Sequence, residues 1–346
     1  MRYIGCKAKL LDYIDNAINS YCPDAKTACD IFSGTATVAR NLKKRFEVTS
    51  NDLLYFSYVL QVATIENDKE PTFKKLLDAG HGNPLKFFNE MDTSSMENLP
   101  IEKRIFQNNY SPIGNRMYFT EENALRIDYA RNKIEEWKKQ DLLSQHEYYY
   151  LLACVIEGIP FVSNTSGTYG AFNKFWDKRS FKTFELFHLP VNTNNLHNRC
   201  YNTDGVELLK SIAGDVLYVD PPYNARQYLP NYHILETAAK YDYPEIKGIT
   251  GQRPSNECKS EFCQKRKVLP AFEKLIANAN YKHIILSYNT EGLMAINDIR
   301  TIMQHYGKPN TFDIIEIPYR RFKSRNTTHN GEIKELLIHI EKETQQ

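Results

Sequence analysis

The sequence lacks a long hydrophobic run of the kind that crosses a membrane. Its longest apolar stretch, 148–156, is followed by Glu157 and is far shorter than the roughly 20 residues that a membrane helix needs. Near the start of the chain Arg2, Lys7 and Lys9 interrupt any apolar segment that would resemble a signal peptide. We therefore expect a soluble, cytoplasmic protein without a membrane partner.

Cysteine is scarce and scattered, and neither sign of charge dominates. The seven cysteines are an odd number, with no C-x-x-C pair and no matching histidine spacing. This pattern predicts a reducing cytoplasm and no metal site. The 44 basic and 42 acidic residues leave a formal charge of +2, which neither demands nor excludes a polyanionic partner.

The first 66 residues predict a Rossmann-like β-α-β unit. A helical pattern covers 7–21, an apolar strand at 28–32 follows, and a loop of small residues leads into a second helical pattern. The next predicted strand, 47–52, ends on an acidic residue roughly 20 positions beyond the loop glycine, as in nucleotide-binding folds.

The middle of the chain has a different pattern. From 67 to 196, long helical stretches such as 121–139 alternate with polar segments rich in Asn, Gly and aromatic residues. Strand patterns then return at 198–203, at 215–219, at 283–286, near Ile314 and near Leu336. We expect an α/β fold with a discontinuous catalytic domain, residues 1–66 and 197–346, and an inserted, mainly helical lobe at 67–196.

The clearest chemical signal is Asp220-Pro221-Pro222-Tyr223, directly after the predicted strand 215–219. Open α/β sheets bind their ligands at the carboxyl ends of strands. The Asp220 carboxylate and the Pro221 carbonyl could accept hydrogen bonds from an amino group of low nucleophilicity, such as that of adenine, and direct its lone pair. Pro222 would stiffen the turn, and Tyr223 would stack on a base. Alone, the four residues could equally form an ordinary turn after a strand.

The loop after the first predicted strand is a second candidate site. Its single glycine, Gly34, does not make the G-x-G-x-x-G pattern that admits a pyrophosphate, but S-adenosylmethionine has no phosphate. Asp52 would then accept hydrogen bonds from both ribose hydroxyls. A purely structural β-α turn capped by Ser or Thr is the alternative. Tyr3 could cover a base, and Lys7 could pair with a carboxylate. Most lysines near a terminus, however, are simply solvated.

Taken in this order, the segments resemble the alpha group of N6-adenine DNA methyltransferases, the Dam-like family that includes many modification enzymes of restriction systems. Gly5-Cys6-Lys7 matches the family's G-x-K segment, 30–36 its D-x-F-x-G-x-G-like loop, and 220–223 its D-P-P-Y. The resemblance runs nearly end to end, with the recognition residues expected at 67–196. The chain departs from the pattern with Tyr3, where Trp is common, and with Ala in place of the second loop glycine.

The resemblance implies a site-specific enzyme that transfers a methyl group from S-adenosylmethionine to N6 of an adenine flipped out of double-stranded DNA, as the modification enzyme of a restriction-modification system. It admits a cognate restriction endonuclease as a partner. The catalytic residues would be Asp220, Pro221, Pro222 and Tyr223. The cofactor-binding residues would be Tyr3, Lys7, Asp30, Phe32, Ser33, Gly34, Asp52, Asp204 and Asp220, with Asp204 contacting the cofactor's adenine.

A polar loop at 164–172 resembles the family's loop beside the target pocket, and basic residues follow it. Backbone amides and cations suit DNA phosphates, which position a protein without reading sequence. The DNA-binding candidates are Asn164, Gly167, Tyr169, Lys174, Lys178 and Arg179. Two further basic groups, 265–267 and 320–325, would extend this surface, although charge runs are more often solvated faces.

Three other functions stay open from the sequence alone. A methyltransferase for cytosine or RNA would share the cofactor loop, although Asp at the first position of the tetrapeptide favours adenine. A nicotinamide-dependent oxidoreductase would explain the β-α-β unit but not the tetrapeptide. A noncatalytic DNA-binding protein would need only the basic loops.

Overall fold

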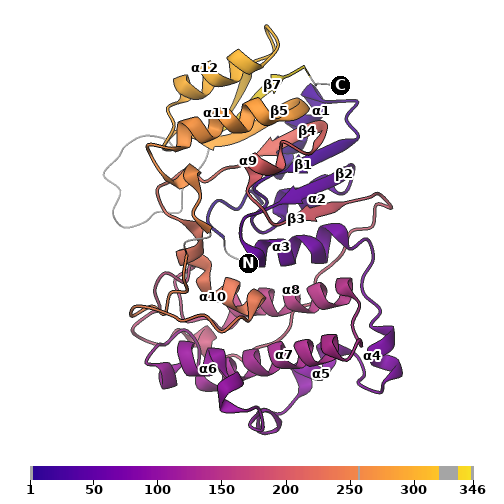
Figure 1. Cartoon of the computed structure of the whole chain (residues 1–346), viewed down its shortest axis with the longest axis vertical. Helices are drawn as coiled ribbons and strands as arrows, with labels where there is room; N and C mark the ends of the chain where they lie inside the picture. The colour runs from indigo at the N-terminus through magenta and orange to yellow at the C-terminus, as the bar shows by residue number, and fades with distance from the viewer. Residues whose placement is uncertain (1–2, 256–257, 319–333, 344–346) are drawn as a thin grey trace.

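The computed structural model describes residues 3–255, 258–318 and 334–343 (Figure 1). The strands are β1 (Thr27–Asp30), β2 (Glu47–Asn51), β3 (Arg199–Tyr201), β4 (Ala213–Val219), β5 (Asn280–Asn289), β6 (Asp313–Pro318) and β7 (Lys334–Glu341). They form a seven-stranded sheet in the order β3-β2-β1-β4-β5-β7-β6. Neighbours from β3 to β5 pair parallel, and β7 runs antiparallel to β5 and β6. The expected Rossmann-like α/β fold is confirmed.

The α-helices of the described residues connect these strands and build a second region beside the sheet. They are α1 (Leu11–Tyr21), α2 (Thr37–Leu42), α3 (Tyr55–Gln61), α4 (Lys74–Asp78), α5 (Pro84–Glu90), α6 (Ile105–Tyr110), α7 (Glu121–Lys139), α8 (Gln145–Val162), α9 (Gly205–Leu208), α10 (Tyr228–Lys240), α11 (Val268–Asn278) and α12 (Ile296–Tyr306). A π-helical turn, Val62–Glu66, continues α3.

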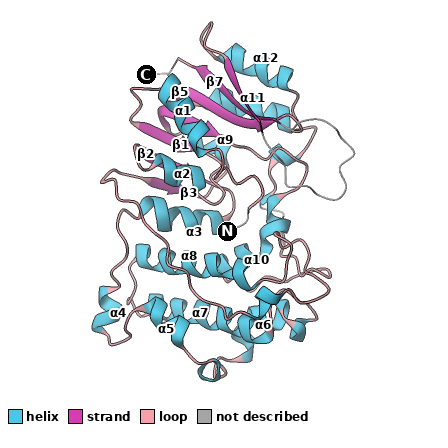
Figure 2. Ribbon diagram, turned by 180° about the vertical axis from the view of Figure 1, so that it is seen from behind, coloured by secondary structure: helices cyan, strands magenta, loops and turns pink. Residues whose placement is uncertain are grey.

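Helices cover both faces of the sheet, as the two opposite views show (Figures 1 and 2). α9, α11 and α12 share one apolar cluster with the sheet, and α1 and α2 share the other. Successive residues of β4 alternate between these clusters: Leu217 and Val219 belong to the first, Val216 and Tyr218 to the second. Because both faces are covered, β4 is apolar at every position of this run.

Strand register brings the carboxyl ends of β1, β2 and β4 together. Asp30, the last residue of β1, lies opposite Ser50 of β2 and Tyr218 of β4. Asp52 and Asp220 each follow their strand two residues beyond these partners. Since the three strands are parallel, all three carboxylates reach the same edge of the sheet.

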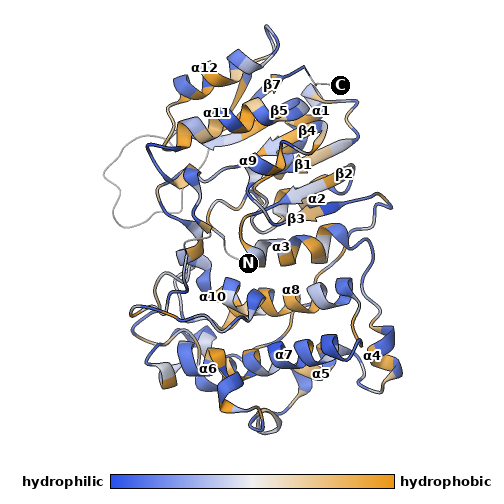
Figure 3. Cartoon of the chain, viewed as in Figure 1, coloured by the Kyte–Doolittle hydropathy of each residue, from blue (hydrophilic) through white to orange (hydrophobic). Residues whose placement is uncertain are grey.

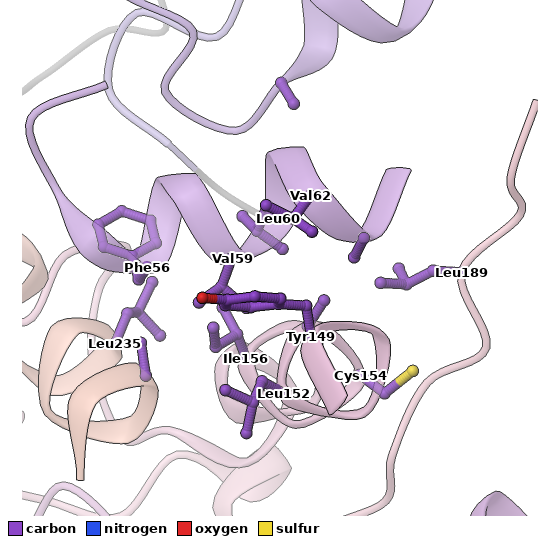
Figure 4. Close-up of a cluster of buried hydrophobic side chains, with 14 of the residues drawn as sticks. Phe56, Val59, Leu60, Val62, Tyr149, Leu152, Cys154, Ile156, Leu189 and Leu235 are labelled. Atoms are coloured by element: carbon purple, nitrogen blue, oxygen red, sulfur yellow. The ribbon is translucent and has the colours of Figure 1, made fainter. Parts of the chain in front are cut away.

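Below the β3 edge of the sheet in Figure 1 lies a second region of helices and long loops. α8 contacts α3 on one side and α7 on the other. Figure 3 shows that α8 is apolar through its middle whereas α7 is largely hydrophilic, which fits a helix enclosed by others and a helix with one solvated face. Figure 4 shows the apolar contact, with Val59 of α3 facing Leu152 and Ile156 of α8.

The chain enters this helical region a second time after β4. α10 contacts both α3 and α8. The guanidinium of Arg131, fully buried on α7, donates a 2.6 Å hydrogen bond to the carbonyl of Ala238 in α10. Further along, the hydroxyl of Tyr110 donates to the carbonyl of Gly251 at 3.3 Å. The expected lobe at 67–196 therefore packs closely against the segment 228–251.

Among the residues that the structure describes, no helix combines the length and the apolar character needed to cross a bilayer.

Gly158 makes a close helix contact that can be tested. A Cβ atom at this position of α8 would lie 2.2 Å from the carbonyl oxygen of Glu185 and 2.9 Å from the ring of Phe184. We expect Gly158→Ala to lower the free energy of unfolding by about 1 to 3 kcal/mol, because the backbone at 184–185 must move away. Urea unfolding measures this. Gln145→Ala, at the exposed start of the same helix, is the control; equal stabilities of the two variants would contradict the contact.

Candidate active site

One pocket at the carboxyl edge of the sheet brings most of the predicted site together. Its lining includes eleven residues named from the sequence: Tyr3, Lys7, Asp30, Phe32, Ser33, Gly34, Asp52, Asp204, Asp220, Pro222 and Tyr223. They come from the N-terminal segment, the ends of β1, β2 and β4, and the start of α9. Pro221 and the six DNA-binding candidates do not line this pocket.

Lys7 is the charged centre of the pocket. Its ammonium lies 3.2 Å from Oδ1 of Asp220 and 3.5 Å from Oε2 of Glu335, and only 5% of its side chain is exposed. The same ammonium lies 5.6 Å from the ring centre of Tyr223. One cation therefore joins the N-terminal segment, the tetrapeptide after β4 and the start of β7.

The protonation of this group follows from burial and charge. Burial by itself lowers the pKa of Lys7, but the carboxylates of Asp220 and Glu335 offset this, so its net pKa lies above the ordinary lysine value. Burial raises the pKa of Asp220 to about 6, against the opposing effect of Lys7. At neutral pH, Asp220 is therefore mainly ionised and can accept hydrogen bonds.

Asp30 is a buried carboxyl with an unused acceptor. Its Oδ2 accepts a 3.1 Å hydrogen bond from the amide of Ala39, whereas its Oδ1 has no hydrogen-bond partner among the described residues. Burial, followed by the nearby Asp220, raises the pKa of Asp30 to about 8. A buried acceptor left without a donor costs stability, so its place in a pocket indicates a ligand site.

Asp52 holds the loop that follows β1. Its Oδ2 accepts a 2.8 Å hydrogen bond from the amide of Gly34, and its Oδ1 accepts one of 2.9 Å from the amide of Leu54. Gly34 has φ of +52°, and a Cβ atom there would lie 2.8 Å from the ring of Tyr3. Glycine is thus required both by backbone conformation and by close approach. Asp204 has a comparable role, since its carboxylate caps α9 through the amides of residues 206 and 207.

Aromatic rings form one wall of the pocket. Tyr3 stacks on Tyr232 of α10 with ring centres 4.6 Å apart, and Tyr228 lies 5.7 Å from Tyr3. The hydroxyl of Tyr232 also accepts a 2.6 Å hydrogen bond from the amide of Ile4. α10 therefore fixes the N-terminal segment over the pocket.

Glu335 and Tyr228 are site residues that the sequence did not reveal. Glu335 starts an apolar strand 115 residues beyond Asp220, and no local pattern links it to Lys7. Tyr228, which lines the pocket, could have been suspected because it closely follows the tetrapeptide on an amphipathic segment.

The loop at 164–172 differs from its expected role in two positions. Asn164 and Tyr169 are 0% and 3% exposed, so a direct side-chain contact to DNA is not supported for either. The side-chain Nδ2 of Asn164 donates hydrogen bonds to the carbonyls of Met117 and Asn173, and this side chain therefore fixes the loop. Gly167 is partly exposed, with φ of +141° and open space where a Cβ atom would lie.

The basic residues after this loop are more accessible. Lys174 and Lys178 are exposed, and Arg179 is half-buried, where its guanidinium donates to the carbonyl of Thr165. The group 265–267 is also exposed. The group 320–325 lies outside the described residues.

The chain is similar to known DNA methyltransferases. A family model described as D12 class N6 adenine-specific DNA methyltransferase matches residues 3–302. The chain is 46% identical over 347 residues to the type II methyltransferase M.FokI of Planomicrobium okeanokoites, covering 99% of this chain and 53% of that protein. It is 42% identical over 343 residues to the modification methylase StsI of Streptococcus sanguinis, which covers 99% of this chain and 52% of that protein.

A shorter relative is matched throughout its length. The type II methyltransferase M.NlaIII of Neisseria lactamica is 37% identical over 354 residues, which cover 99% of this chain and 100% of the relative. The chain thus spans about half the length of M.FokI and StsI and all of M.NlaIII.

The buried carboxyl of Asp30 should make stability depend on pH. A carboxyl whose folded pKa is raised to about 8 stabilises the fold fully below the ordinary value near 4 and loses that contribution as pH rises through 8. We expect Asp30→Asn to become more stable relative to the wild type as pH rises from 5 to 9. Urea unfolding across this range tests it, with the exposed Asp298→Asn as control. Parallel curves for wild type and Asp30→Asn would contradict the assignment.

Glu335 should raise the pKa of Asp220. In Glu335→Gln the repulsion between the two carboxylates is removed while Lys7 stays beside Asp220, so the pKa of Asp220 should fall below about 6. A carbon NMR titration of the Asp220 carboxyl measures the shift. Glu341→Gln, at the far end of β7 and paired with Lys308, should leave it unchanged. An unchanged pKa in Glu335→Gln would show that the two carboxylates are not coupled.

Proposed function

Because this chain belongs to the family of D12 class N6 adenine-specific DNA methyltransferases, we propose that it transfers a methyl group from S-adenosylmethionine to the N6 nitrogen of an adenine in double-stranded DNA. The observation that carries this proposal is the pocket in which Asp220 of the tetrapeptide lies with Lys7, Asp30 and Asp52. A site with acceptors for both an amino group and a polar cofactor suits this reaction.

The pocket fits S-adenosylmethionine on its own features. The unpartnered Oδ1 of Asp30 can accept a hydrogen bond from an amino or hydroxyl group of the cofactor. Gly34 allows close approach to the loop backbone, and the ring of Tyr3 offers an apolar surface beside it. Asp52 would bind the ribose of the cofactor and Asp204 its adenine. Phe32, Ser33 and Lys7 are the other proposed cofactor-binding residues. When bound, the cofactor supplies a methyl group activated by its sulfonium.

The tetrapeptide would activate and orient the target amino group. The ionised carboxylate of Asp220 and the carbonyl of Pro221 each accept one hydrogen bond from the amino nitrogen, and the lone pair is thereby directed toward the methyl donor. Lys7 holds Asp220 in place at 3.2 Å. Pro222 restricts the turn, and Tyr223, held by a 3.0 Å hydrogen bond from the amide of Leu293 to its carbonyl, stacks on the base.

The target adenine must leave the DNA stack to reach this pocket, since its amino nitrogen is otherwise inside the duplex. We assign the sheet-bearing parts, 1–66 and 197–346, to catalysis and 67–196 to DNA recognition. The position of the loop at 164–172 beside α10 supports DNA binding near the pocket. The amide of Tyr169 donates a 2.7 Å hydrogen bond to the carbonyl of Asn231 on α10, and the first turn of α10 carries Tyr228, which lines the pocket.

The biological role would be protection of a specific DNA site. M.FokI, StsI and M.NlaIII are named as type II methyltransferases or modification methylases. By analogy we propose that this chain is the modification enzyme of a restriction-modification system, with an endonuclease for the same site as its cellular partner. Such an enzyme would work in the cytoplasm, on the nucleoid.

Loss of Asp220 should abolish methyl transfer. Asp220→Ala removes the acceptor for the target amino group, and we expect a loss of at least about 100-fold in rate, comparable to removal of a main electrostatic contact in other enzymes. The measurement is incubation with methyl-labelled S-adenosylmethionine and duplex DNA, followed by nucleoside analysis. Asp298→Asn is the control. Label in cytosine or only in RNA would redirect the substrate assignment, and a fully active Asp220→Ala would refute the mechanism.

Lys174 and Lys178 should contribute to DNA affinity through phosphates. In the double variant Lys174→Gln, Lys178→Gln, we expect weaker binding to all sequences and a salt dependence reduced by about 2 in slope. Fluorescence anisotropy at several salt concentrations measures both. The double variant Lys74→Gln, Lys75→Gln is the control. It removes two lysines of α4, at the other end of the helical region from α10, and should keep the wild-type salt dependence (Figure 1). An unchanged slope in the first variant would remove these lysines from the interface.

A further inference from the structure

Three metal-ligand side chains converge in the core, away from the pocket. Cys22 caps the end of α1, His283 lies on β5, and His339 lies on β7. Their donor atoms all lie within 4.8 Å of one another, and the residues are 2%, 7% and 5% exposed. None of them lines the candidate active site.

Strand pairing explains why the two histidines meet. In the antiparallel pair of β5 and β7, His283 lies opposite Glu341, and His339 is two residues before Glu341. Side chains in this diagonal relation share one face of a sheet. α1 covers that face, and the ring of Tyr21 stacks on His339 with centres 4.0 Å apart. Cys22, the next residue, is thereby held beside both imidazoles.

The distances suit one ion bound by both histidines. Nδ1 of His283 and Nε2 of His339 are 3.2 Å apart. Two nitrogens that each lie about 2.0 to 2.1 Å from one tetrahedral zinc ion are separated by roughly 3.3 Å. The same distance also allows a hydrogen bond between the two rings, which is the competing explanation. In either arrangement Nδ1 of His339 is buried without a hydrogen-bond partner among the described residues, so metal binding itself must distinguish the two.

The protonation states also suit a metal. Burial lowers the pKa of both histidines, that of His339 to about 4, so both imidazoles are neutral, as ligands must be. Burial raises the pKa of the Cys22 thiol to about 12, so the thiol carries its proton until a metal displaces it. The other charges that act on the cluster are mixed in sign: Lys282, Lys308, Asp215, Asp313 and Glu341.

We propose that Cys22, His283 and His339 bind one Zn²⁺ ion, which fastens the end of α1 to β5 and β7. A sulfur and two imidazole nitrogens, without an oxygen ligand, favour zinc over magnesium or calcium. Binding forms one Zn–S and two Zn–N bonds, breaks the S–H bond of Cys22 and releases that proton to solvent. No electron is transferred, and the site is independent of the proposed methyl transfer.

Cobalt(II) binding to the full, untagged chain tests the proposal. After treatment with a chelator, the wild type should take up one equivalent of Co²⁺ with a near-ultraviolet thiolate-to-metal band and strong visible bands of tetrahedral cobalt. Zn²⁺ should displace the cobalt and raise the melting temperature. Cys22→Ser should lose the thiolate band, and His283→Gln should weaken uptake at least tenfold. Cys154→Ser, which removes a buried cysteine of α8, should keep the band.

The wild type alone decides the question if a variant fails to fold. Wild-type protein that takes up no stoichiometric Co²⁺ or Zn²⁺ would overturn the proposal and leave a hydrogen-bonded histidine pair only. A band that persists in Cys22→Ser, or disappears in Cys154→Ser, would place the ion elsewhere and overturn it as well.

Discussion

The buried ion pairs of Lys7 are the interaction on which the candidate site depends. The ammonium contacts carboxylates from two distant parts of the chain, Asp220 after β4 and Glu335 at the start of β7. A buried charge is tolerated only when it is paired, and removing one partner from such a group is costly. The N-terminal segment is thus held over the carboxyl edge of the sheet by the same residues that the proposed chemistry requires.

The sheet and the helical region contribute different things to this site. Parallel strand ends place Asp30, Asp52 and Asp220 at one edge with little freedom, because backbone pairing fixes their positions. The helical region supplies the aromatic wall through α10, where Tyr232 contacts the N-terminal segment. The pocket therefore lies where the two regions meet, and a shift between them would alter the aromatic wall more than the carboxylates.

Local patterns were enough to predict the β-α-β unit and the tetrapeptide at the end of β4. Each is encoded within a few neighbouring residues, by alternation of apolar positions or by turn-forming residues. Contacts between distant segments could not be predicted in this way. The partner of Lys7 on β7, the return of the chain through α10, and the burial of Asn164 and Tyr169 all depend on packing. The cluster of Cys22 with His283 and His339 was not predicted for the same reason. Sequence patterns for metal sites identify ligands that are close together along the chain, and these three residues are not.

The position of Glu335 also bears on when the site can form during synthesis. β7 inserts between β5 and β6, and its first residues carry the second carboxylate for Lys7. A nascent chain that has already produced the loop of Gly34 and the tetrapeptide still lacks this partner until β7 leaves the ribosome. The site is therefore assembled late, and a product truncated before β7 would have Lys7 paired with Asp220 alone and an exposed edge on β5.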